Sequence, residues 1–162
     1  MNITIREYHE DDLDEILPIW NEVVTTGRAF PQVETLSKET GAQFFAAQTR
    51  TAVAVDDKRI LGLYILHPND IGRKAHVANA SYAVSEEARG LGIGRLLVLD
   101  SIEQLSPHGF TGLQFNAVVA SNLGAIHLYE SIGFTRIGTI PGGFRNIDGD
   151  LEDMHIFYHP AR

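Results

Sequence analysis

The sequence contains no cysteine. This absence excludes disulfide bonds, a thiolate nucleophile and metal sites built on cysteine. Long apolar runs are absent too, since no segment approaches the roughly 20 residues that a membrane-spanning helix requires. Residues 1–9 are polar and mixed, unlike a secretory signal peptide. We therefore expect a cytoplasmic protein that does not contact a membrane.

Basic residues are few compared with acidic ones. The 13 Lys and Arg residues against 21 Asp and Glu residues give a formal net charge of -8 at pH 7, which argues against nucleic acid as a partner. Seven histidines are present, but only His155 and His159 are spaced as on one helix face. Both fall in a predicted strand and its tail, and no third ligand has suitable spacing. We therefore expect no metal site.

One domain over residues 1–162 is the natural interpretation, because no repeat, linker or low-complexity block divides the chain. Alternating and helical apolar patterns predict a mixed sheet with helices on both faces, an α/β class fold. Asp11 or Asp12 is expected to cap a first helix that Pro18 should kink or divide. The predicted strands cover residues 3–8, 51–55, 60–66, 75–84, 112–119, 134–140 and 152–158. The later helices are predicted at residues 37–49, from the glycine-rich turn at 89–95 to about residue 105, and at residues 122–132. A long glycine-rich loop is predicted at residues 141–150.

The most informative stretch places three glycines at every second position between two arginines. A predicted strand precedes it, and an apolar run that opens a helix follows it. Glycine removes the side chains that would keep a ligand off the backbone. The first amides of a helix have no internal partner, so they can bind an anion such as a phosphate. A tight turn without a ligand is the alternative interpretation. The stretch consists of Arg89, Gly90, Leu91, Gly92, Ile93, Gly94 and Arg95.

The glycine spacing separates this stretch from two nucleotide-binding motifs. It reads G-x-G-x-G rather than G-x-G-x-x-G, and it lies mid-chain, so it does not match the Rossmann fingerprint. No lysine followed by Ser or Thr completes a Walker motif, which disfavours an NTPase. Because the net charge would repel a phosphate, Arg89, Arg95 and the oriented amides must reverse the potential locally.

A second group of residues begins at Asn122, which follows a predicted strand and is a good helix N-cap. Tyr129 comes seven residues later and hence lies two turns along the same helix face. Gly133 then ends the helix as a C-terminal glycine, and Phe134 follows. A capped amphipathic helix with a tyrosine in the core would explain this pattern without any chemistry.

Together the two groups resemble the GNAT superfamily of N-acetyltransferases. Arg89, Gly92 and Gly94 satisfy that family's cofactor signature of Gln or Arg, two residues, Gly, one residue, then Gly or Ala. Asn122 and Tyr129 match its second signature, an Asn at the end of the next strand followed by a helix that carries Tyr and ends in Gly-Phe. Both signatures stand in register, which makes the resemblance specific.

The resemblance extends from residue 3 to about residue 158. It implies the acyl-CoA N-acyltransferase fold, with a mostly antiparallel central sheet splayed between its fourth and fifth strands and helices on both faces. Residues 77–84 and 138–145 resemble the small-substrate branch of the superfamily, which acts on amino acids and similar compounds. Members of the family often dimerise, so the resemblance leaves a homodimer open.

The resemblance implies acetyl-coenzyme A (acetyl-CoA) as the cofactor. Its pyrophosphate would lie on the amides of residues 89–95, and its pantetheine arm would bond as a pseudo-strand to the backbone near Tyr82 and Val84. Asn122 and Tyr129 complete the implied cofactor-binding set. Tyr129 would protonate or hydrogen-bond the leaving sulfur, and the amide of Val84 would bind the thioester oxygen.

Removing a proton from the attacking amine is the larger demand. An alkyl ammonium has a pKa of about 10.4, so on the order of one molecule in a few thousand is nucleophilic at pH 7. Some relatives place a Glu on the strand before the glycine turn, but this strand carries no acid. Asn79 can hold a water or the substrate but cannot take a proton. A water chain, His76, or an amine that arrives neutral remain as alternatives, with His76 the least favoured.

The acceptor side is expected at the loop after the first helix and at the final hairpin. Arg28 and Phe30 are candidates for a substrate wall, Arg145 is a candidate partner for a carboxylate, and Asn79 is expected to contact the substrate. The leading hypothesis is acetyl transfer to the primary amine of a small molecule. A protein N-terminus or lysine as the acceptor, and a coenzyme A-binding module without turnover, are the alternatives.

Overall fold

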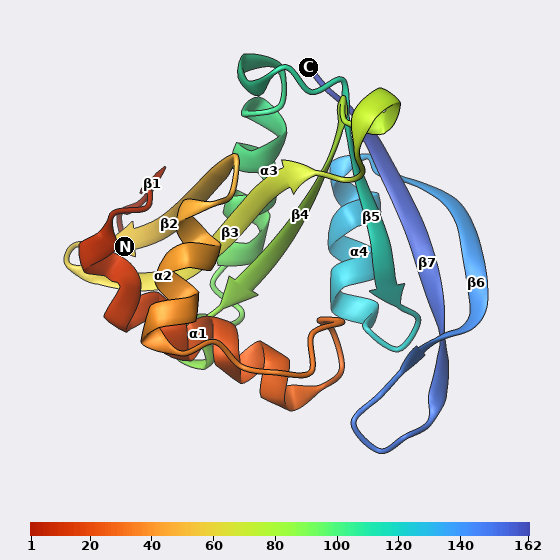
Figure 1. The fold of residues 1–162 in the computed structure, drawn as a ribbon, viewed down its shortest axis with the longest axis horizontal. Helices are drawn as coiled ribbons and strands as arrows, with labels where there is room; N and C mark the ends of the chain where they lie inside the picture. Colours follow the sequence, from red (N-terminus) through yellow and green to blue (C-terminus); the bar gives the residue numbers. More distant parts are fainter.

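The computed structural model describes all 162 residues as one seven-stranded sheet covered by four α-helices (Figure 1). None of the helices combines the length and the apolar composition needed to cross a bilayer. The strands are β1 (Ile3–Glu7), β2 (Arg50–Asp56), β3 (Arg59–Pro68), β4 (Val77–Val84), β5 (Gly112–Val119), β6 (Thr135–Arg145) and β7 (Leu151–Pro160). The helices are α1 (Leu13–Thr26), α2 (Lys38–Ala46), α3 (Ile93–Glu103) and α4 (Leu123–Ile132), with short 3-10 turns η1 (Glu10–Asp12), η2 (Gly72–Lys74), η3 (Glu86–Ala88) and η4 (Ser106–His108).

The sheet is antiparallel except at its centre. The strand order is β1-β2-β3-β4-β5-β7-β6, and only β4 and β5 run parallel. These two strands pair at Val77 with Gly112 and at Ala78 with Leu113, and no further. Beyond this point they diverge, which opens a wedge in the middle of the sheet (Figure 1). The predicted mixed sheet with a splay between its fourth and fifth strands is confirmed.

Two apolar clusters hold the helices to opposite faces of the sheet. One cluster joins α3 and α4 to the centre of the sheet, and the other joins α1 and α2 to β2 and β3. Trp20 of α1 is 1% exposed and packs against Phe30 and Phe45. Burying large side chains of this kind contributes about 1.5–3 kcal/mol each before entropy is counted. The core therefore fixes the positions of α1 and α3 on the sheet.

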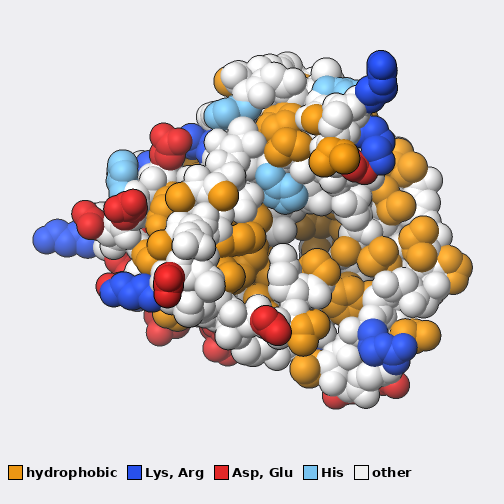
Figure 2. All heavy atoms as spheres, in the orientation of Figure 1, with side chains coloured by type: hydrophobic (Ala, Val, Ile, Leu, Met, Phe, Trp, Pro, Cys, Tyr) orange, Lys and Arg blue, Asp and Glu red, His pale blue; other side chains and the backbone are white.

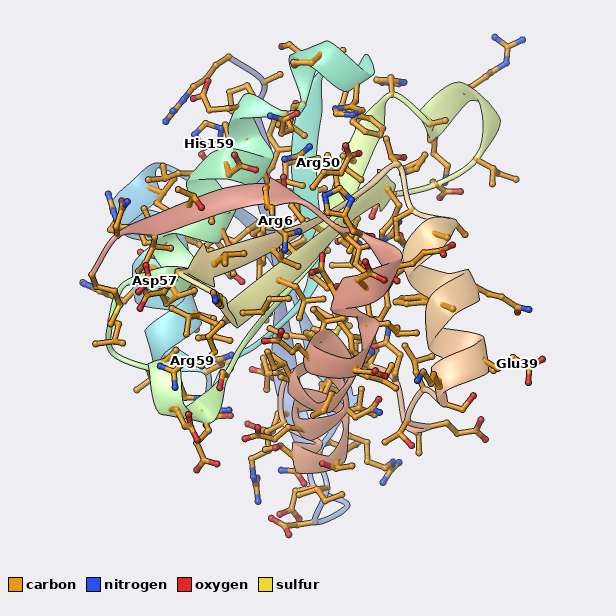
Figure 3. All side chains as sticks on the ribbon, turned by 90° about the vertical axis from the view of Figure 1, so that its left-hand side faces the viewer. Arg6, Glu39, Arg50, Asp57, Arg59 and His159 are labelled. Carbon is orange, nitrogen blue, oxygen red and sulfur yellow. The ribbon has the colours of Figure 1, made fainter.

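Polar contacts add a second anchor for α3. The hydroxyl of Tyr64 on β3 donates to Oδ2 of Asp100 at 2.7 Å, and Nε of Arg50 donates to the same hydroxyl at 2.9 Å. Figure 3 shows Arg50 on the side of the sheet near β1 and β2. Because buried polar groups are costly unless they are bonded to one another, this chain of contacts sets where α3 sits on the sheet.

Of the two effects expected of Pro18, a kink or a division of the first helix, the division does not occur. Pro18 lies inside α1, which runs unbroken as 14 residues. A proline removes one internal hydrogen bond and crowds the preceding turn. Here Ile16 and Ile19 on either side of it are buried, so packing against the sheet outweighs that local cost.

The long loop expected at residues 141–150 is largely a strand. β6 continues to Arg145, and the connection to β7 is only residues 146–150. The pairing of β6 with β7 shifts register between Ile140 and Phe144. A bulge of this kind accommodates the glycines of the segment without ending the strand pairing. The glycine content of residues 141–150 therefore resembled that of a loop although most of the segment is a strand.

Asp12 occupies the first position before α1, as expected, but its side chain makes no cap bond to that helix. Instead its two oxygens accept from the guanidinium of Arg6 at 2.8 and 2.9 Å, and Oδ2 also accepts the backbone N–H of His9 at 2.8 Å. Figure 3 shows Arg6 on β1. The hydrogen bonds from Arg6, ahead of that from His9, hold the pKa of Asp12 below its usual value.

We expect Asp12→Asn to lower the free energy of unfolding by about 1 kcal/mol at pH 6, since Arg6 is partly solvated and the charged pair is lost. The folded pKa is depressed, so this stabilisation is present above the ordinary aspartate pKa of about 3.9 and is lost as pH falls through the folded value. Urea unfolding of the wild type and of Asp12→Asn at pH 6 and pH 3 measures the difference in their free energies of unfolding. An equal difference at the two pH values would contradict this account.

Candidate active site

The edge of β4 that faces the wedge carries unpaired backbone groups. β3 and β4 pair antiparallel without a bulge, and at one end Ser85 N–H donates to the carbonyl of Leu61 at 2.8 Å. In such a ladder the backbone groups of alternate residues point to the same side. The N–H and C=O groups of Ala80, Tyr82 and Val84 therefore point toward β5, which has already diverged. These groups offer hydrogen bonds to an extended ligand lying in the wedge.

The glycine turn lies directly after this edge and ends at the start of α3. Gly90 and Gly92 both have φ of +79°, and a Cβ built on either would meet nothing within 4 Å. Their backbone is therefore open to solvent as well as left-handed, a conformation that glycine adopts without penalty. None of the six consecutive N–H groups from Gly90 to Arg95 donates a hydrogen bond within the protein. Such a row of free donors at a helix N-terminus suits a phosphate.

The two arginines of the glycine turn are exposed and each has a partner. Arg89 forms an ion pair with Glu22 of α1 at 3.4 Å, and Arg95 donates to the hydroxyl of Ser131 on α4 at 3.1 Å. Exposed pairs of this kind are worth little and exchange readily. Both guanidinium groups can therefore turn toward an anion that binds the backbone amides of residues 90–94, which lie between them.

On the other side of the wedge, Asn122 and Tyr129 stand on α4. Asn122 caps the helix by accepting the N–H of Ala125 at 3.3 Å, and Gly133 ends it at φ +114°. Both roles were expected from the sequence. The ring of Tyr129 lies 4.6 Å from that of Phe115, and its hydroxyl forms no hydrogen bond within the protein. Burial raises the pKa of Tyr129 well above its ordinary value, so the hydroxyl keeps its proton across the neutral range.

A cavity of about 290 Å³ occupies the wedge between β4 and β5. In the space-filling view it is the hollow near the centre of the molecule, with hydrophobic side chains around it (Figure 2). None of its lining residues carries a formal charge at neutral pH, and no group of three or more His, Cys, Asp or Glu side chains anywhere in the chain could hold a metal ion. The lining consists of Ala29, Phe30, Pro31, Asn79, Ala80, Ser81, Tyr82, Phe115, Asn116, Ala117, Val118, Asn122, Ala125 and Tyr129.

The structure separates the expected acceptor-side residues. Phe30 and Asn79 line the wedge cavity. Arg28 does not: it pairs with Asp148 of the final hairpin at 2.6 Å, beside Arg89 and Asn122. Arg145 lies in a neighbouring cavity of about 480 Å³, which also contains Phe30, and it donates to the carbonyl of Gly149 at 3.1 Å. The two arginines therefore stand around the cavity rather than in it.

His76 is exposed and lies ahead of β4, at the closed end of the wedge. It lines a separate polar cavity and not the wedge cavity. Ser81, Asn116 and Asn69 line these cavities but were not predicted as site residues from the sequence. Ser81 and Asn116 follow the alternation that places polar residues of β4 and β5 on one face, which is a signal in the sequence. Asn69 sits in the connection after β3, and no pattern pointed to it.

A family model described as "Acetyltransferase (GNAT) family" matches residues 13–134. N-acetyltransferase aca1 of Schizosaccharomyces pombe is 34% identical over 102 residues, which cover 62% of this chain and 49% of that protein. An N-alpha-acetyltransferase of Saccharolobus solfataricus is 30% identical over 98% of this chain and 93% of its own length. The chain thus spans about half of aca1 and smaller shares of several other relatives.

Solved structures agree with the family model. A GCN5-related N-acetyltransferase from Kribbella flavida superposes with a TM-score of 0.90 at 36% identity, over 98% of this chain and 97% of its own. YncA of Salmonella typhimurium, solved with acetyl-CoA, has the same fold, with a TM-score of 0.93 at 20% identity over 100% of this chain and 95% of its own. The wedge, the free amides and these matches lead to one assignment: the chain belongs to the GNAT family of N-acetyltransferases.

Proposed function

We propose that this chain transfers the acetyl group of acetyl-CoA to the primary amine of a small molecule. One observation carries the proposal. The row of free amides from Gly90 to Arg95 continues into the unpaired edge of β4, and that edge leads to a cavity where the Tyr129 hydroxyl has no partner. These are the three contacts that the diphosphate, the amide-bearing arm and the thioester of acetyl-CoA require, in the right order.

The arm of the cofactor contains two amide groups in an extended chain. It would bond to the edge of β4 as an added strand, beginning at the backbone groups of Val84, which are the nearest of the three to the glycine turn. Val84 does not line the cavity that contains Tyr129, whereas Tyr82 does, so the amide available to the thioester oxygen is that of Tyr82 rather than that of Val84. A donor aimed at the place where negative charge develops stabilises the tetrahedral transition state, and removing one such donor typically costs about 10²–10³-fold in rate. Because this donor belongs to the backbone, a side-chain change at residue 82 leaves it in place.

The reaction forms one bond from the amine nitrogen to the acetyl carbon and breaks the bond from that carbon to sulfur. The lone pair of the amine attacks the thioester carbon, an N–C bond forms, and the C–S bond breaks. The nitrogen loses one proton to solvent, and the sulfur gains one from Tyr129, which solvent then reprotonates. A thiolate of pKa near 8.5 leaves tolerably without help, so Tyr129 assists rather than determines whether the reaction occurs. Asn79 lines the cavity where the amine would arrive.

The size of the cavity favours a small acceptor. About 290 Å³ is at the lower end of the range for small-molecule sites. A specific observation favours a second candidate: the relative that matches this chain over 98% of its length is named an N-alpha-acetyltransferase. Its acceptor would be a peptide N-terminus, entering between the loop that contains Phe30 and the final hairpin.

We expect a panel of amines to separate these functions when the release of free thiol from acetyl-CoA is followed. The panel contains amino acids, amino-acid amides, alkyl amines, and peptides of four or more residues with free N-termini. The small amines should give kcat/KM values at least about tenfold above those of the peptides, because a peptide does not fit in the enclosed part of the cavity. Peptides as the better substrates would support the second candidate. Turnover on no amine, with tight binding of coenzyme A, would contradict both.

A further inference from the structure

The acceptor cavity lacks any charge that could neutralise an ammonium ion. Its 14 lining residues include no Asp, Glu, Lys, Arg or His. An ammonium ion that entered would lose hydration without gaining a counter-charge, which is costly in a partly apolar site. A neutral amine of the same shape avoids that cost and already has the lone pair that attacks the thioester.

Charged groups near the cavity are outside it and mostly paired. Asp70 pairs with Lys74, Arg28 with Asp148, and Arg89 with Glu22. His67 is the cross-strand neighbour of Asn79, but its Nδ1 bonds the carbonyl of Pro68 and it lines a different cavity. Of the titratable groups around the wedge, only the phenols of Tyr82 on β4 and Tyr129 on α4 line the cavity. The others line neighbouring cavities: His67 of β3, Asp70 and Lys74 of the β3–β4 connection, His76 ahead of β4, Arg28 after α1 and Arg145 of β6.

A chain of hydrogen bonds between neutral side-chain amides fixes the orientation of Asn79. Oδ1 of Asn69 accepts from Nδ2 of Asn79 at 3.1 Å and from Nδ2 of Asn116 at 2.6 Å. Nε2 of Gln114 donates in turn to Oδ1 of Asn116 at 2.8 Å. One N–H of Asn79 Nδ2 is bonded to Asn69, and Oδ1 of Asn79 accepts no hydrogen bond within the protein, so this oxygen is free to accept one from a ligand in the cavity that Asn79 lines. By accepting from Nδ2, Asn69 holds the amide of Asn79 in the orientation that leaves Oδ1 without a partner in the protein.

Resting on the function proposed above, we infer that this site takes its amine in the neutral form, on Oδ1 of Asn79, with Asn69 as the positioning residue. One N–H of the neutral amine donates to Oδ1, which leaves the lone pair free to attack. The N–C bond forms as the C–S bond breaks, the surplus proton on nitrogen passes to water, and the departing thiolate takes a proton from Tyr129, which solvent then reprotonates. The substrate class is therefore amines whose conjugate acids have lowered pKa values, such as α-amines of amino-acid derivatives.

Two isomeric substrates test the neutral-amine requirement. Nε-acetyl-lysinamide offers an α-amine of pKa about 8, and Nα-acetyl-lysinamide offers a side-chain amine of pKa about 10.4. At pH 7 we expect kcat/KM to be about a hundredfold higher for the first. The ratio should fall steadily as pH rises toward 10, because the neutral fraction of the second amine grows. Burial raises the pKa values of Tyr82 and Tyr129, so these phenols do not distort the profile.

His67→Gln serves as the control for this pH profile. A histidine base would impose an inflection near pH 6.5 that is the same for both isomers, and His67→Gln would remove it. We expect instead that the variant keeps the wild-type profile. A ratio that stays constant with pH, or an inflection that His67→Gln abolishes, would overturn the inference. Because both isomers must first be turned over, failure of the proposed function is seen separately, as no thiol release at all.

Variants of Asn69 test the positioning role. Asn69→Leu removes the acceptor oxygen at similar volume, and Asn69→Asp keeps it. We expect Asn69→Leu to raise KM for the amine about tenfold with little change in kcat or in acetyl-CoA affinity, and Asn69→Asp to restore KM to within about threefold. A merely structural role would affect both variants alike and would not separate KM from kcat.

A measurement without turnover completes the test. Side-chain amide protons of Asn79 and Asn116, observed by nitrogen-15 NMR, should exchange slowly in the wild type and in Asn69→Asp and rapidly in Asn69→Leu. Equal exchange in all three proteins would overturn the positioning role even if the enzyme proved inactive on every amine. Thermal unfolding of each variant establishes that the fold is retained.

Discussion

Tyr129→Phe should lower kcat for acetyl transfer about a hundredfold while leaving the affinity for acetyl-CoA nearly unchanged. The variant removes only the hydroxyl, which has no partner in the protein and faces the wedge cavity. A positioned proton donor is typically worth about 10²–10⁴-fold. We choose the lower end because the departing thiolate is a fair leaving group. The ring contacts with Phe115 and Phe134 remain, so packing is preserved.

Tyr158→Phe is the matched control, since it removes a phenol hydroxyl from β7 outside the cavity lining. Its kcat should stay within about twofold of the wild type. Steady-state kinetics at saturating acetyl-CoA, together with calorimetry of coenzyme A binding, separates the two effects. If Tyr129→Phe weakened cofactor binding and left kcat intact, the hydroxyl would be a binding contact and the proton would come from elsewhere.

The sequence was most informative where local chemistry determines the backbone. The strand at 112–119 and the cap and end of α4 at Asn122 and Gly133 agree with the structure. So does the splay, which the resemblance implied. The strand and the two helix ends follow from spacing, capping and glycine conformation, which act over a few residues. The family resemblance then supplied the mostly antiparallel sheet and its splay between the fourth and fifth strands, which no local pattern determines.

The sequence was least informative where contacts join distant segments. The tip of the final hairpin bonds to the end of α1: Ile147 N–H donates to the carbonyl of Gly27 at 3.0 Å, and Arg28 pairs with Asp148. Arg28 was expected at the substrate wall because nothing local shows a partner 120 residues away. Asn69 was overlooked for the same reason. Its importance lies in two amides that reach it from β4 and β5, on either side of the wedge.

The second large effect is expected at the glycine turn, where Gly92→Val should weaken binding of coenzyme A by about a hundredfold or more. The residue has φ +79° and directly precedes α3. A side chain there would project into space that is now open, beside the amides proposed to hold the diphosphate. A hydrogen bond to a charged group is worth about 1.5–3 kcal/mol, so losing two of them already gives a factor of this size.

Backbone strain alone would also reduce binding by unfolding part of the protein, so the control must carry the same strain. Gly109 has φ +81°, a Cβ built on it meets nothing within 4 Å, and it lies after η4, at the opposite end of α3 from the glycine turn. Gly109→Val should therefore lose a similar amount of stability, about 1–2 kcal/mol, and bind coenzyme A as the wild type does. Equal weakening by both variants in calorimetry would mean that strain, not access to the amides, governs the site. Weakening by Gly92→Val alone would tie the diphosphate to the N-terminus of α3.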